Sequence, residues 1–174
     1  MLKDFIDEYA RYRRIGEKAI QQLADTELNI VVSSDINSIA IIVRHISGNF
    51  ISRFTDFLSS DGEKPWRDRD SEFQEATYTR DAIEKMWAEG WRVLESELAT
   101  LTDEQLQNTV SIRGQPWTVH DALCRSLAHV SYHIGQIVVM ARILKQGDWD
   151  WISIPRNKSR DYNTNPTMEK IPER

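Results

Sequence analysis

The stretch from residue 119 to residue 145 limits the possible folds more than any other. Its apolar residues recur almost all round a helix of 3.6 residues per turn: Val119, Leu123, Leu127, Val130, Ile134, Ile137, Val138, Ala141 and Leu144. Thr118 and Asp121 form a capping-box pattern at its start, and Gly147 ends it. A helix that is apolar on most of its surface is usually central. The sequence therefore predicts a helical protein built around this segment.

Three further helices are predicted from apolar residues spaced three and four apart, over residues 2–25, 35–58 and 80–101. Ser34 or Asp35 is the expected N-cap of the second, because either side-chain oxygen can accept a free backbone N–H. Thr79 is the expected N-cap of the third. Together with the apolar segment, these helices predict an all-α four-helix bundle.

The remaining segments lack a helical period. Residues 59–78 form a charged crossover between the second and third helices, longer than the ~12–15 residues beyond which loops are usually functional or disordered. Two interpretations stay open for it: a solvated, salt-bridged loop, or a lid or dimer contact. Residues 110–117 are expected to be extended, as a hairpin around Arg113–Gln115. Residues 148–174 form an irregular tail, mobile over about 164–174.

Composition restricts the class of protein. The length fits one domain over residues 1–174. The net charge of −5 and the lack of a Lys/Arg-rich tract argue against nucleic-acid binding. No apolar run approaches the ~20 residues of a membrane span, and no signal-peptide core is present, so we expect a cytoplasmic protein. Cys124 is the only cysteine, which excludes an intrachain disulfide, and we expect it in the core.

Three histidines form the most informative group. His129 and His133 are four residues apart on one helix, so their imidazoles can converge. His45 lies on the polar edge of the second helix, on the same side as Asn49. His120 lies nine residues before His129, about 180° round the helix, and is excluded from the group. Taken alone, the His129–His133 pair favours ordinary core or surface histidines over metal ligands.

A site made by His45, His129 and His133 would suit a borderline divalent metal and leave a coordination position open, which is the catalytic pattern. The sequence lacks the HExxH motif of metalloproteases. We expect metal affinity to fall below pH ~6, because ordinary imidazoles have a pKa of ~6.5. The candidates for orienting groups or substrate contacts are Asn49, Gln136, Tyr132, Arg53, Arg67 and Arg69.

One difficulty concerns the second helix. His45 lies nearly opposite the apolar arc of that helix. If His45 meets the other two histidines, the polar edge must face inward. We then expect something else, such as a second subunit, to cover the apolar arc.

Four segments carry a resemblance to a known family: NSIAIIVRHISGNFISRFTDFL, SSDGEKPWRDRDSEF, HVSYHIGQIVVMARIL and the tail segment WISIPRNKSRDYN. They resemble DUF1572, a family related to the DinB/YfiT-like superfamily of metalloproteins. The resemblance implies a four-helix bundle, a homodimer, and a zinc or nickel ion held by His45, His129 and His133. Some superfamily relatives transfer or isomerise thiol conjugates with bacillithiol or mycothiol.

Three functions follow as hypotheses. The first is a metal-dependent S-transferase that acts on a small molecule with a low-molecular-weight thiol such as bacillithiol. The second is a metal-dependent hydrolase. The third is a metal or small-ligand binding protein without catalytic activity.

Overall fold

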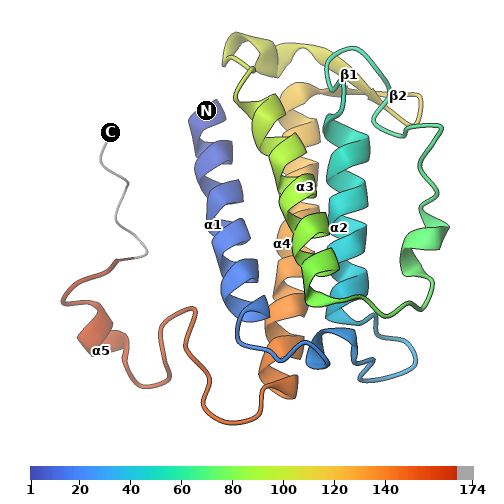
Figure 1. Cartoon of the computed structure of the whole chain (residues 1–174). Coiled ribbons are helices and arrows are strands. Elements are labelled where there is room, and N and C mark those ends of the chain that lie inside the picture. Colours follow the sequence, from blue (N-terminus) through green and yellow to red (C-terminus); the bar gives the residue numbers. More distant parts are fainter. Residues whose placement is uncertain (168–174) are drawn as a thin grey trace.

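The computed structural model describes residues 1–167, and most of them are helical. Four long helices lie side by side (Figure 1): α1 (Leu2–Ile20), α2 (Ile39–Phe54), α3 (Arg80–Leu98) and α4 (Val119–Leu144). The contacts between them run mainly between α2 and α3 and between α1 and α4, and α2 also touches α4. The expected helical architecture is confirmed at this level.

A small antiparallel hairpin accompanies the helices. Strands β1 (Thr109–Ile112) and β2 (Gln115–Thr118) pair directly before α4. The hairpin itself was predicted, and its two-residue turn explains it: Arg113 and Gly114 have φ values of 56° and 71°. Positive φ at both turn residues gives the type I′ geometry that matches the twist of the paired strands.

The starts of α3 and α4 lie where the sequence predicts them. The hydroxyl groups of Thr79 and Thr118 accept the backbone N–H groups of Ala82 and Asp121. The first two helices are shorter than predicted. After Ile20, the chain continues as turns into the 3₁₀ helix η1 (Glu27–Asn29), whose Glu27 carboxylate accepts the N–H of Ala24.

The predicted start of α2 at Ser34 or Asp35 was wrong. Ser38 is the N-cap, because its hydroxyl oxygen accepts the Ile41 N–H while its own backbone is extended. The helix ends at Phe54 rather than near 58, since Thr55 is already extended, with a φ of −70° and a ψ of 123°, and Asp56 follows with a φ of 49°. At both ends, therefore, the local backbone geometry of one or two residues overrides the apolar period.

The long crossover between α2 and α3 descends beside α2 (Figure 1) and contains the 3₁₀ helix η2 (Asp70–Phe73), which contacts α2. A further 3₁₀ helix, η3 (Glu104–Gln107), precedes β1. Over residues 148–167, the tail is irregular apart from the short α5 (Ser159–Tyr162). Of the tail expected to be mobile, residues 168–174 lie outside the described residues. That the chain forms a single domain stays a prediction.

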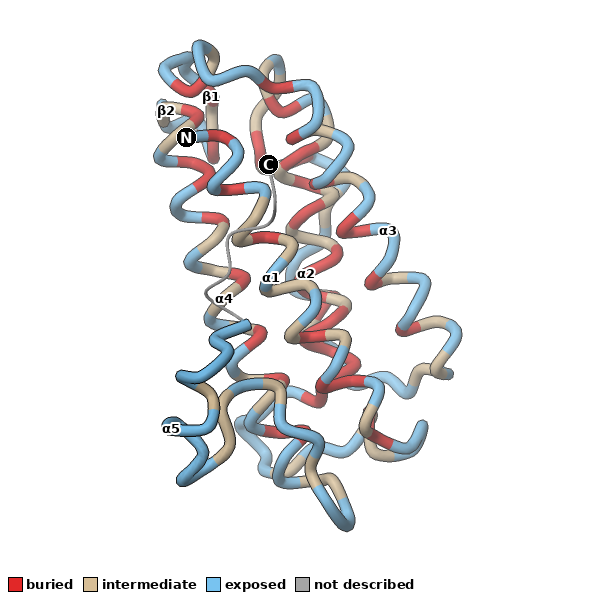
Figure 2. The backbone as a smooth tube through the Cα atoms, turned by 90° about the vertical axis from the view of Figure 1, so that its left-hand side faces the viewer, coloured by how far each residue is buried: buried red, intermediate tan, exposed pale blue. Residues whose placement is uncertain are grey.

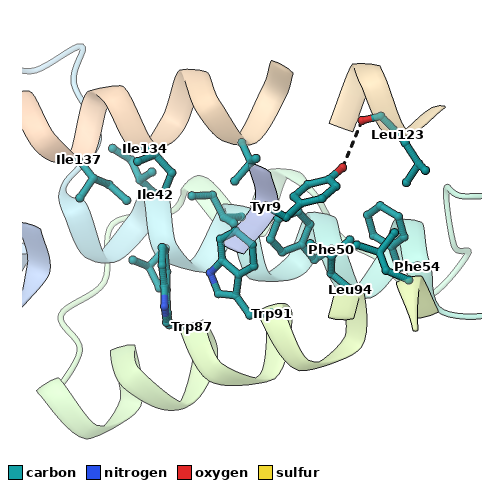
Figure 3. Packing of buried hydrophobic residues seen from close by; sticks show 14 of the residues in the cluster. Tyr9, Ile42, Phe50, Phe54, Trp87, Trp91, Leu94, Leu123, Ile134 and Ile137 are labelled. Carbon is teal, nitrogen blue, oxygen red and sulfur yellow. Dashed lines mark hydrogen bonds between the residues drawn. The ribbon is translucent and has the colours of Figure 1, made fainter. Parts of the chain in front are cut away.

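The core surrounds α2. Buried residues lie on the facing sides of the long helices (Figure 2). Trp91 of α3 packs against Phe50 of α2, with ring centroids 4.9 Å apart, and Tyr9 of α1 donates its hydroxyl to the Leu123 carbonyl of α4 (Figure 3). The chain's own helices thus cover the apolar arc of α2, which needs no second subunit for this purpose.

The outer face of α4 carries several exposed apolar side chains. Tyr132, Val139 and Ile143 are all more than half exposed. Of the described helices, α4 alone has the length and mean hydropathy that a membrane span would need, although it packs along α1.

Cys124 lies on the exposed side of α4, so the expectation that it belongs to the core was wrong. A residue about 140° round the helix from His129 faces outward because the histidine side faces α2.

Asp61 fastens the hairpin to the crossover. Its carboxylate accepts the backbone N–H groups of Glu63, Arg113 and Gly114 at 2.7–2.8 Å and the hydroxyl of Ser111. These hydrogen bonds, of which that from Ser111 has the largest effect, hold the pKa of Asp61 well below its ordinary value. The turn is therefore held by a carboxylate that stays charged in acid.

We expect the substitution Asp61→Ala to lower the free energy of unfolding by about 1–3 kcal/mol, because the turn N–H groups lose their acceptor. Urea denaturation of the variant beside Asp4→Ala, an exposed carboxylate in the first turn of α1, measures the difference. Equal destabilisation by the two substitutions would contradict the role of Asp61.

Candidate metal centre

Three histidines meet between α2 and α4. His45 comes from α2, and His129 and His133 come from successive turns of α4. The Nε2 atom of His129 lies 3.2 Å from the Nε2 atom of His45 and 3.2 Å from that of His133. One ring nitrogen from each of the three falls within 4.8 Å of the others. The structure thus brings together the three residues that the sequence singled out and leaves His120 outside.

The ring of His45 is oriented by a carboxylate. Its Nδ1 atom lies 2.7 Å from Oε2 of Glu72, a residue of η2 in the crossover. Because an ionised carboxylate can only accept, Nδ1 of His45 carries a proton, and in the neutral imidazole that metal binding needs, Nε2 then presents a lone pair. Burial opposes ionisation of Glu72, but hydrogen bonds from His45 and Arg67 hold its pKa below the ordinary value. The tautomer of His45 is therefore fixed.

Arg67 in turn orients Glu72. Its Nε and Nη2 atoms donate to the two carboxylate oxygens at 2.8 and 3.0 Å, and both side chains are almost fully buried. Gly48 of α2 makes room for this carboxylate, since a Cβ at that position would collide with Oε1 of Glu72. The crossover and α2 thus hold one buried chain of contacts that ends at His45.

His133 is oriented in the same manner. Its Nδ1 atom lies 2.8 Å from Oε1 of Gln136, one turn further along α4. The amide oxygen accepts, so the proton is on Nδ1 and the Nε2 lone pair is directed at His129. The sequence predicted Gln136 as a neighbour of this pair from its position on the helix.

The resulting donor set fits a divalent cation. Two imidazoles with fixed tautomers present Nε2 lone pairs toward the same nitrogen of His129, which can donate a proton to only one of them. A metal ion would satisfy all three. Nitrogen ligands of a tetrahedral ion with bonds of ~2.0–2.1 Å lie about 3.3–3.4 Å apart, close to the two separations found here. Histidine ligands also usually donate their other ring N–H to a carboxylate or carbonyl group.

Burial favours the neutral imidazoles that metal binding needs. Burial lowers the pKa of His129 to about 3, and the neighbouring imidazoles and arginines add to the effect. Burial also lowers the pKa of His133, against the hydrogen bond to Gln136. Protons compete with a metal only below the ligand pKa, so competition here begins at lower pH than for exposed histidines.

The pH at which metal is lost should therefore be lower than the ~6 expected from ordinary imidazoles. We expect the loss of metal to be centred below pH ~6, because burial lowers the pKa values of both His129 and His133. Equilibrium dialysis against a fixed free-metal concentration at several pH values measures this. A steep loss centred near pH ~6.5 would contradict the prediction.

A cavity of about 350 Å³ opens beside the histidines and is lined by His45, His129, Asn49, Arg53, Arg67 and Arg69, among others. Asn49 and Arg53 thus lie beside the histidines, as predicted. Tyr132 is 63% exposed and touches the ring of His133 from outside, with centroids 5.0 Å apart, and it is not part of the cavity wall.

Sequence reasoning missed Glu72 and the packing of Phe73 against His45, whose rings are tilted by 37° with centroids 4.6 Å apart. Both belong to the crossover, for which two interpretations stayed open. A clue was present in Phe73, an aromatic residue within a charged loop. The pairing of Glu72 with Arg67 and His45 has no helical or strand period that would reveal it.

Comparison with protein families gives a match over most of the chain. A family model described as "Protein of unknown function (DUF1572)" matches residues 1–158, which include all three histidines and the whole crossover. None of the curated proteins compared with the chain matches it significantly.

Proposed function

The chain belongs to the DUF1572 family, and we propose that it is a divalent-metal-dependent enzyme with His45, His129 and His133 as the metal ligands. The convergence of the three Nε2 atoms, two of them with tautomers fixed by Glu72 and Gln136, carries this proposal. Imidazole nitrogens suit zinc and nickel, and three protein ligands leave a position free for a reactant.

A divalent ion held there would supply Lewis acidity, lowering the pKa of a thiol or a water molecule so that it reacts as a nucleophile at neutral pH. The chain's own residues prepare the site for it. Glu72 and Gln136 hold the imidazoles in the correct tautomer, and Arg67 holds Glu72. The cavity next to His45 and His129 gives a reactant access from one side.

The wall of the cavity favours a thiol over water as the nucleophile. Among the described residues that line it, there is no Asp or Glu. A hydrolase generally needs a positioned base to take the proton of the attacking water. A thiol, with an ordinary pKa of ~8.5, needs much less assistance. We therefore propose a low-molecular-weight thiol S-transferase, with a metal-dependent hydrolase as the second candidate.

The test is turnover of an electrophile with bacillithiol, with and without zinc or nickel. Thiol- and metal-dependent transfer by the wild type, and its loss in His129→Ala, is the expected result. Turnover of an ester and amide panel without thiol would support the hydrolase instead. Stoichiometric metal binding with no turnover in either assay would reduce the protein to a metal-binding module.

We also propose that the four helices form a DinB/YfiT-like bundle that associates as a homodimer through the outer face of α4. The exposed side chains of Tyr132, Val139 and Ile143 support this choice of face. Sedimentation should give a dimer at micromolar concentration, which Val139→Glu combined with Ile143→Glu converts to a monomer. A monomeric wild type would contradict the proposal.

A further inference from the structure

The cavity beside the histidines has an unusual charge. Five arginines line it: Arg53, Arg67, Arg69, Arg113 and Arg125. They come from α2, the crossover, the hairpin turn and α4, so the fold gathers them from four separate segments. The chain as a whole has a net charge of −5. Positive charge is therefore concentrated at this one place against the overall balance.

The carboxylates near these arginines do not neutralise them. Glu72 pairs with Arg67 and also holds His45. Glu63 is shared by three guanidinium groups, with its Oε2 atom 3.4 Å from Arg53, 3.9 Å from Arg67 and 3.2 Å from Arg113. Arg69 reaches an oxygen of the exposed Asp70 only at 3.8 Å. An excess of positive charge remains around the cavity.

Arg53 shows most directly that a partner is lacking. Its Nη1 atom is buried and has no hydrogen-bond partner among the described residues. Burial lowers the pKa of Arg53. The attraction of Glu63 opposes this change, and repulsion by Arg67, Arg113 and Arg125 lowers the pKa further. A buried guanidinium N–H without an acceptor costs free energy that an anionic ligand would recover.

Arg125 lines the cavity from α4, the helix that also carries His129. Its guanidinium group is held over the ring of Trp117, 5.2 Å from the centroid. No carboxylate among the described residues forms an ion pair with it. Stacking on an aromatic face fixes the orientation of an arginine without using its N–H donors.

We propose that this cavity binds a small molecule with at least two negative charges, a phosphate ester or a dicarboxylate, through Arg53 and Arg125. The inference deepens the proposed function and rests on it in one respect: the bound anion lies beside the candidate metal ligands His45 and His129. The volume of about 350 Å³ falls at the small end of ligand sites and suits a metabolite rather than a polymer.

The experiment measures binding to the metal-free protein by isothermal titration calorimetry at constant ionic strength. Inorganic phosphate and succinate are the dianionic probes, and acetate is the monoanionic reference. We expect at least one dianion to bind ten-fold or more tightly than acetate. Whichever dianion binds more tightly identifies the source of the charge.

Arg53→Met and Arg125→Met should each weaken dianion binding about ten-fold or more, as the loss of a charge-assisted hydrogen bond requires. Arg92→Met is the matched control, because Arg92 is an exposed arginine of α3 that pairs with Glu89 outside the cavity. Arg125 is exposed on α4, so its variant tests the inference even if Arg53→Met unfolds.

Equal affinity for succinate, phosphate and acetate, or equal dianion affinity in Arg125→Met and Arg92→Met, would overturn the inference. Because the protein is metal-free in these titrations, the result is independent of the metal proposal. Metal binding without dianion selectivity removes the anion site alone, and dianion selectivity in a protein that takes up no metal removes the metal proposal alone.

Discussion

Replacing Glu72 with alanine should lower the free energy of unfolding by about 3–5 kcal/mol, because it leaves the buried guanidinium group of Arg67 without its carboxylate. The same substitution should weaken metal binding about 10–100-fold, since His45 loses the partner that fixes its tautomer. One loop residue would thus affect both stability and the metal centre.

The matched control for this substitution is Glu89→Ala. Glu89 accepts hydrogen bonds from Nε and Nη2 of Arg92 in the same bidentate geometry, but this pair is exposed on α3. Exposed ion pairs contribute little, so this variant should unfold much as the wild type does. Urea denaturation of the two variants gives the comparison, and similar midpoints would contradict the structural role of Glu72.

Gly48→Ala separates the two effects of Glu72. The added methyl group would displace the Glu72 carboxylate from its place beside α2, while the charge that Arg67 needs remains in the protein. We expect this variant to lose metal affinity with a smaller loss of stability than Glu72→Ala. Unchanged metal affinity would show that the orientation of His45 does not depend on this contact.

The second large effect concerns the ligands. His129→Ala should weaken metal binding by more than the ~10–100-fold expected for Glu72→Ala, which removes only a hydrogen-bond partner of a ligand. His129 itself supplies the nitrogen atom that both other histidines face. His120→Ala is the control on the same helix, since His120 packs against Phe5 away from the site. Competition with a chromophoric chelator measures both affinities.

Circular dichroism should show the same helix content in both histidine variants. The loss of metal affinity would then not result from unfolding. If His120→Ala and His129→Ala bound metal equally tightly, the three histidines would not be the ligands.

Much of the helical fold could be predicted from the sequence, because α4 is both capped and periodic. The starts of α3 and α4 follow from Thr79 and Thr118, whose hydroxyl groups accept backbone N–H groups in the structure. The start of α2 could not be chosen correctly among Ser34, Asp35 and Ser38, since both serine and aspartate serve as N-caps.

The candidate site was predictable where it lies on one helix. His129, His133 and Gln136 share a face of α4, which the spacing alone reveals. The position of His45 could not be predicted in this way. Because α2 is buried on nearly all sides, the pattern of polar and apolar residues does not indicate which side of α2 faces α4. Glu72 depends on the path of an irregular crossover, which only tertiary structure defines.

The metal content of the purified wild-type protein tests the central proposal most directly. After incubation with zinc or nickel and removal of free ions, elemental analysis should find one divalent ion per chain, with none retained by the variant that has alanine at His45, His129 and His133. A wild type that retains no more metal than this triple variant would contradict the account.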